Sequence, residues 1–88
     1  MLIDELRKLT KSVKEAAELA AKEYVESKKF ADILKERASQ GLSNAYIAIV
    51  LSHNAKYTLQ EFGNALVKEL EDEGFLADLN GNIVEVRW

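Results

Sequence analysis

The chain has 88 residues, of which 48% are hydrophobic and 31% are charged, and its formal net charge is −3. This balance is too apolar for a disordered segment and too polar for a membrane protein, so we expect one soluble domain spanning residues 1–88. A chain of this length buries only about 60–65% of the surface that its unfolded form exposes. A partner subunit would therefore add to its stability.

Cysteine is absent and His53 is the single histidine, which excludes disulfides, thiolate metal ligands and thiol catalysis. The longest apolar run, residues 45–51, is far shorter than the roughly 20 residues of a transmembrane helix. The N-terminal residues also lack the basic start of a signal peptide. We expect a cytoplasmic protein that does not engage a membrane.

Charge is spread unevenly along the chain. Residues 1–40 hold nine Lys or Arg against eight Asp or Glu, a balance of +1, whereas residues 41–88 hold three against seven, a balance of −4. An acidic surface repels phosphate backbones and attracts basic partners. We therefore do not expect nucleic acid as a partner.

The first predicted element is a helix over residues 2–39, because Gly and Pro are absent from residues 2–38 and apolar or small residues recur at helical spacing. The recurring residues are Ile3, Leu6, Val13, Ala17, Ala20, Tyr24, Ala31 and Leu34. Two roles fit this stripe: covering a sheet within the domain, or pairing with a helix of another subunit. Ser27 could cap a new helix that starts near Lys28, so the helix is either continuous or broken once.

A strand is predicted over residues 44–51, which are rich in β-branched and aromatic side chains. Alternation places Ile47, Ile49 and Leu51 on one face and Tyr46, Ala48 and Val50 on the other. Neither face is strongly polar. We therefore expect this strand in the middle of a small sheet.

A second helix is predicted over residues 58–73. Thr58 and Glu61 have the spacing of a capping box, in which each side chain accepts a hydrogen bond from the other residue's backbone N–H. Gly74 has the position of a helix-ending glycine. The apolar stripe of this helix consists of Leu59, Phe62, Leu66 and Leu70.

Two strands, over residues 75–79 and 83–88, complete the chain and are joined by a turn centred on Asn80-Gly81, a strong hairpin signal. The fold class is therefore α+β in the order α-β-α-β-β, with a long N-terminal helix and a three-stranded sheet that ends in a hairpin. The right-handed rule for crossovers favours a first strand parallel to one member of the hairpin.

The sequence predicts no catalytic residue, no cofactor, no metal site and no enzyme activity. His53 could act as a general base or a metal ligand only with partners that its sequence neighbours do not supply, so a surface histidine is the simpler interpretation. An acidic cluster at the end of the second helix lacks the pattern of a calcium loop and opposes the helix dipole. It comprises Glu69, Glu71, Asp72 and Glu73. These residues are candidates for contact with a basic protein surface, although a solvated helix end is the ordinary interpretation.

Two further sets of residues are candidates for binding. Tyr24, Lys28, Lys29 and Phe30 combine cations with aromatic rings and could hold an anion, although interleaved acids neutralise much of that charge. Trp88 on the last strand is either a core anchor or an exposed interface residue. The segment 58–88 also has the order of a winged helix, but the acidic exposed face of its helix would be repelled by DNA.

The order of these segments resembles small uncharacterised accessory proteins of tailed bacteriophages. The resemblance rests on residues 33–41 before a strand, on a capped helix ending at 70–75, and on Asn80-Gly81 before the final residues 83–88. It covers about residues 12–88 and carries no catalytic or binding residue with it. It implies a phage protein in a bacterial host, where small non-enzymatic proteins bind host machinery or blunt host defences.

Three functions follow as hypotheses. The first is a non-enzymatic interaction protein that binds and modulates a host or phage protein. The second is an oligomeric sponge that captures an anionic nucleotide between subunits, with helix one as a possible oligomer contact. The third is a structural, virion-associated subunit.

Overall fold

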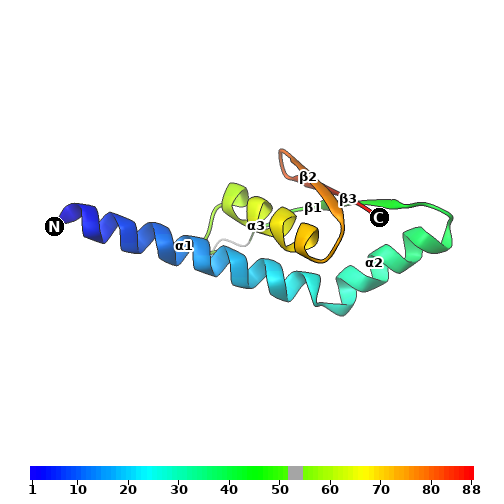
Figure 1. Ribbon diagram of the computed structural model, residues 1–88, viewed down its shortest axis with the longest axis horizontal. Helices are drawn as coiled ribbons and strands as arrows, with labels where there is room; N and C mark the ends of the chain where they lie inside the picture. Colours follow the sequence, from blue (N-terminus) through cyan, green and yellow to red (C-terminus); the bar gives the residue numbers. More distant parts are fainter. Residues whose placement is uncertain (52–54) are drawn as a thin grey trace.

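The computed structural model describes residues 1–51 and 55–88. Its elements, in order, are α1 (Leu2–Val25), α2 (Lys28–Ser39), β1 (Asn44–Ala48), α3 (Leu59–Asp72), β2 (Leu76–Asn80) and β3 (Ile83–Arg87). The α+β class is confirmed, but the predicted helix 2–39 is two helices, α1 and α2 (Figure 1). Within the described ranges no helix is both long enough and apolar enough to cross a membrane.

Ser27 separates the two N-terminal helices, so the broken form of the two alternatives is the observed one. Its backbone is extended, and its Oγ accepts a hydrogen bond from the N–H of Phe30 (3.3 Å) and donates one to the carbonyl of Tyr24 (2.6 Å). This is a helix N-cap joined to the end of the preceding helix. The break lets α2 turn away from α1 and carries Phe30 into the core.

Replacing Ser27 by alanine removes both hydrogen bonds, so we expect the free energy of unfolding to fall by about 0.5–2 kcal/mol. Urea denaturation followed by circular dichroism measures the change. Ser39→Ala is the matched control, because the Ser39 hydroxyl is exposed and bonds only the local carbonyl of Glu36. Equal effects of the two substitutions would show that Ser27 does not hold the junction.

The sheet has the order β1-β3-β2, and β3 pairs antiparallel with both neighbours. β1 and β2 therefore run parallel to each other, as predicted, but β1 lies at an edge and not in the middle. Its inner face, with Ala45 and Ile47, is buried, whereas Tyr46 on the outer face is exposed. Apolar residues on both faces of β1 therefore did not indicate a central strand. The outer face of this sheet is open, so its side chains are exposed even where they are apolar. β1 is also shorter than the predicted strand 44–51.

The hairpin turn is displaced by one residue from the predicted centre. Asn80 pairs with Ile83, so Gly81 and Asn82 form the two-residue loop. Gly81 has a φ of +62°, whereas the φ of Asn82 is not positive. This combination fits a hairpin turn with glycine at the first of its two central positions. The glycine therefore decides the register of the hairpin, and the asparagine before it belongs to the strand.

α3 is the middle layer of the molecule, with the sheet on one side and α1 on the other (Figure 1). Thr58 caps it as predicted, since its Oγ accepts from the N–H of Glu61 (3.1 Å), although the reciprocal bond is not found within the described part of the chain. Gly74 ends it with a φ of +100°. The core comprises Ala21, Phe30, Ile47, Ile49, Leu66, Leu70, Val84 and Val86. Through the small residues Ala17 and Ala21, α1 covers α3 and not the sheet, contrary to the sheet-covering role proposed for it.

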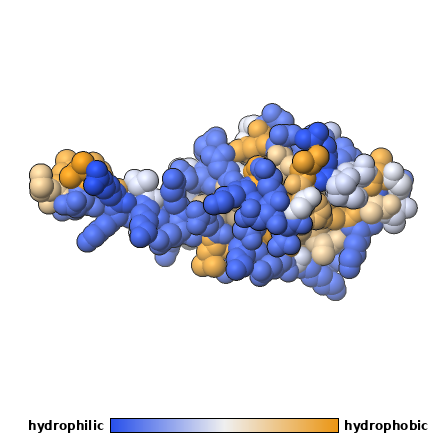
Figure 2. All heavy atoms as spheres, viewed as in Figure 1, coloured by the Kyte–Doolittle hydropathy of each residue, from blue (hydrophilic) through white to orange (hydrophobic). Residues whose placement is uncertain are grey.

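The whole molecule measures 56 × 25 × 22 Å. The first three turns of α1 extend beyond the rest of it. We call residues 2–12 the projecting segment, because the N-terminal part of α1 runs past the start of α3 (Figure 1), which lies beside Leu9, Thr10 and Val13. Its apolar stripe, Leu2, Ile3, Leu6 and Leu9, is exposed. Figure 2 shows hydrophobic residues gathered at the N-terminal tip of this helix, away from the core.

Candidate protein-docking groove

An apolar groove of about 380 Å³ opens between α2 and the end of the hairpin. α2 contributes residues spaced i, i+3, i+4 and i+7, which share one helix face, and the other wall comes from the residues that flank β2 and β3. The lining residues are Ala31, Leu34, Lys35, Ala38, Phe75 and Trp88. The groove is a shallow, largely apolar depression that is wide open to solvent, and its volume falls within the range of binding sites. We refer to it as the Trp88 groove.

Both walls of the Trp88 groove are held by hydrogen bonds or by the core. On the α2 side, the guanidinium of Arg37 donates to the backbone carbonyl of Asn44 (3.0 Å) and to its Oδ1 (3.4 Å). On the hairpin side, the N–H of Trp88 donates to the carbonyl of Ser43 (3.0 Å). The ring of Phe75 meets the buried ring of Phe30 edge-on, with centroids 6.4 Å apart. The groove is therefore formed before any partner arrives.

Trp88 is exposed and does not belong to the core, so it is not the core anchor that was one of its two predicted roles. Its backbone extends the pairing of β1 with β3, while its side chain lines the groove and the residue remains 44% exposed. A tryptophan whose backbone is hydrogen-bonded in a sheet and whose ring is partly exposed offers a large apolar area at a low cost in conformational entropy. Such residues dominate the binding energy of many protein interfaces.

An acidic rim lies close to Phe75 in sequence, although its residues are not part of the groove lining. We give this name to Glu71, Asp72 and Glu73, all exposed at the end of α3. The chain reaches Phe75 two residues later, and the pairing of Leu76 with Arg87 sets Phe75 beside Trp88. The fourth predicted acid, Glu69, is half-buried. The structure thus brings two separate candidates from the sequence, the acidic cluster and Trp88, to one end of the molecule.

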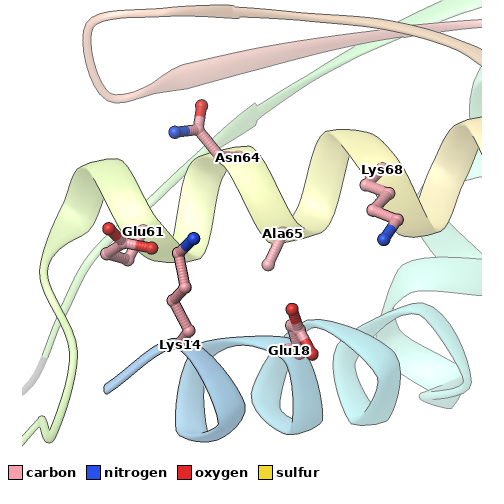
Figure 3. Close-up of a pocket in the computed structure, with 6 residues that line it drawn as sticks. All are labelled: Lys14, Glu18, Glu61, Asn64, Ala65 and Lys68. Carbon is pink, nitrogen blue, oxygen red and sulfur yellow. The ribbon is translucent and has the colours of Figure 1, made fainter. Parts of the chain in front are cut away.

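Another cavity, of about 400 Å³, lies elsewhere, between α1 and α3. Figure 3 shows Lys14 and Glu18 of α1 reaching toward α3, and Lys68 reaching back toward α1. Its charges balance, with two lysines against Glu18 and Glu61, and Asn64 and Ala65 complete the lining. The lining contains no hydroxyl, thiol or imidazole. Solvation of a helix-helix seam accounts for these residues.

The four predicted anion-binding residues are brought together only in part, although the rings of Tyr24 and Phe30 are in contact, with centroids 5.5 Å apart. Tyr24 and Lys29 line a cavity of about 240 Å³, whereas Phe30 is buried in the core and Lys28 lies outside the cavity lining. The remaining lining comes from residues 47–51, Tyr57 and Phe62. This volume is below the roughly 300–1,000 Å³ of typical ligand sites. The helix break at Ser27 places Phe30 in the core, beside Tyr24.

Burial raises the pKa of the Tyr24 hydroxyl. A raised pKa in the folded state means that the unfolded chain ionises first, so this contribution to stability is complete below about pH 10 and is lost as the pH rises through the folded-state value. We expect the urea midpoint to fall less between pH 9 and 11 in Tyr24→Phe than in the natural chain. Tyr46→Phe, which alters an exposed ring, controls for the loss of a tyrosine. Identical pH dependence in all three proteins would contradict this prediction.

His53 lies outside the described residues. Among the described residues, no group of three or more acidic or histidine side chains could hold a metal ion. A winged helix would need helix at residues 45–51, and β1 occupies residues 44–48.

Sequence reasoning did not find the wall that α2 gives to the groove. Ala31 and Leu34 were predicted as part of the apolar stripe of the first helix, and Phe75 as the start of a strand. Comparison of the chain with protein-family models, with curated proteins and with solved structures found no match.

Proposed function

We propose that the chain is a non-enzymatic interaction protein that holds an apolar segment of a partner protein in the Trp88 groove. Basic residues flanking that segment would lie against the acidic rim. The observation that carries this proposal is the meeting of a preformed apolar groove, an exposed Trp88 and three exposed acids at one end of the molecule. In the setting implied by the resemblance to phage accessory proteins, the partner is a host or phage protein in the bacterial cytoplasm.

The placement of the acidic rim supports a binding role. Acidic side chains at the C-terminus of a helix oppose its dipole and cost about 0.3–1 kcal/mol each. The last turn of α3 holds no basic residue to offset them. A helix end with only a structural role gains nothing from this arrangement, whereas a surface that attracts a basic partner gains both association rate and specificity.

The groove is better suited to a protein partner than the polar cavity between α1 and α3. Apolar area removed from water contributes about 25 cal/mol per Å², and the groove lining is apolar apart from the amine of Lys35. The polar cavity presents two lysines and two glutamates, which are well hydrated and would have to be stripped of water on binding.

Selection of peptides from a displayed random library tests the proposal. We expect enriched peptides to carry an apolar anchor flanked by Lys or Arg, and a selected peptide to bind about tenfold or more weakly to Ala38→Arg, which fills the groove from an exposed helical position. Ala48→Arg is the matched control, since it makes the same change at an exposed residue of β1. Enrichment of acidic peptides, or unchanged binding to Ala38→Arg, would refute the proposal.

A further inference from the structure

The projecting segment of α1 meets the rest of the described chain only at its C-terminal end, where Leu9 and Thr10 line a cavity with Thr58 and Glu61. Its apolar residues include Leu6 and Leu9, which are 52% and 64% exposed. Contiguous apolar side chains at one end of a soluble protein mark an interaction site. Because α1 continues unbroken to Val25, the segment is presented as a preformed helix about 16 Å long.

The chemistry of this segment matches that of the Trp88 groove. Arg7, Lys8 and Lys11 outnumber Asp4 and Glu5 along the segment, whereas the acidic rim carries three negative charges. An amphipathic helix with basic flanks is the kind of ligand that an apolar groove with acidic residues nearby accepts. The same chain therefore carries both a groove and a suitable ligand for it.

The two elements lie at opposite ends of the long axis (Figure 1). The segment cannot reach the groove of its own chain, because it is continuous with a rigid helix. We infer that the projecting segment of one copy docks in the Trp88 groove of a second copy, which gives head-to-tail association. This inference rests on the proposed function, since it names an occupant of the same groove. A contact of this kind does not close on itself and can add further copies.

Head-to-tail docking is favoured over symmetric pairing of two projecting segments. The apolar stripe from Leu2 to Val13 is centred between residues 7 and 8. Symmetric pairing about that point would bury the two stripes against each other but would bring no acidic cluster to Arg7, Lys8 and Lys11. Docking in the groove instead brings the basic residues toward acids. The contact is small beside a standard interface of about 1,600 Å², so we expect association to be weak and dependent on concentration.

Sedimentation velocity of the full chain, with variants that block each half of the contact, tests this inference. Leu6→Gln with Leu9→Gln removes the stripe at exposed positions, and Ala38→Arg blocks the groove. We expect the natural chain to sediment faster as concentration rises from micromolar to millimolar, and each variant alone to remain a monomer. An equimolar mixture of the two variants should form dimers and nothing larger, because each supplies the half that the other lacks. Leu19→Gln, at another exposed leucine of α1, should associate like the natural chain.

Two results would overturn the inference. Dimers of Ala38→Arg alone would show that the segments pair with each other, and a natural chain that stays monomeric at millimolar concentration would show that they do not dock. Circular dichroism of every variant establishes that it is folded. If the chain stays monomeric while selected basic peptides still bind in the groove, the inference fails and the proposed function stands. If neither the chain nor any peptide binds, both fail.

Discussion

Leu66→Ala is expected to lower the free energy of unfolding by about 2–5 kcal/mol, the usual cost of truncating a fully buried leucine. Leu66 is 0% exposed and lies on α3, the layer covered by the sheet on one side and by α1 on the other. The surrounding side chains cannot close the cavity without moving α3 relative to one of its neighbours. Since small domains have about 5–15 kcal/mol of stability in total, thermal unfolding should shift downward by roughly 10–30 °C.

Leu19→Ala provides the control for this prediction. The residue change is the same and the position is also helical, but Leu19 is 60% exposed on α1. Its effect should stay within about 0.5 kcal/mol. Similar losses at positions 66 and 19, measured by differential scanning calorimetry, would show that α3 is not the middle layer of the fold.

Changing the acidic rim to lysine should weaken peptide binding and, at the same time, raise the stability of the fold. With Glu71, Asp72 and Glu73 all changed to lysine, we expect the affinity for a basic peptide selected on the natural chain to fall about tenfold or more. The free energy of unfolding should rise by about 1 kcal/mol, because cations at the end of α3 complement the helix dipole. Isothermal titration calorimetry and urea denaturation measure the two quantities. This opposite movement is expected only if the acids serve binding at a cost to the helix.

Glu15→Lys with Glu18→Lys makes a comparable charge change on α1, away from the groove. Both residues are exposed, so peptide affinity should change little beyond the effect of net charge, which added salt removes. Equal loss of affinity in both proteins would attribute binding to overall charge. A loss of stability on reversing the rim would mean that these acids make structural contacts.

The elements that were predictable from the sequence are those specified by local chemistry. Thr58 caps α3 through a bond to a residue three positions away, and Gly74 ends the helix with a positive φ that other residues rarely adopt. The alternation of buried Val84 and Val86 with less buried residues likewise follows from the period of a strand. Each of these signals is complete within a few residues.

The features that were missed depend on contacts between distant segments. The edge position of β1 is decided by the pairing of β3 with both other strands, which no pattern within residues 44–51 encodes. The burial of Phe30 follows from the turn of α2 after Ser27, which was one of two open alternatives. In the hairpin, either Asn80 or Gly81 could have been the first loop residue. Gly81 takes that position because it adopts a positive φ readily, and this sets the pairing of Asn80 with Ile83.

The candidate site was predictable only in parts. Trp88 and the acidic cluster were recognised separately, by residue type and by their unfavourable position on a helix. Their proximity follows from the return of the chain from α3 into β2 beside β3, which is a property of the topology. The α2 wall could not be found because alanine and leucine on a helix face look the same whether that face is covered or open.

Chemical-shift mapping by NMR tests the central claim most directly, because it reports on individual residues throughout the chain. If the Trp88 groove binds a selected basic, apolar peptide, titration of the labelled chain should produce the largest shifts at the Trp88 indole, at Phe75, and at Ala31 and Ala38 on α2. Smaller shifts are expected at the acidic rim. Shifts confined to the cavity between α1 and α3, around Lys14 and Lys68, would contradict the claim.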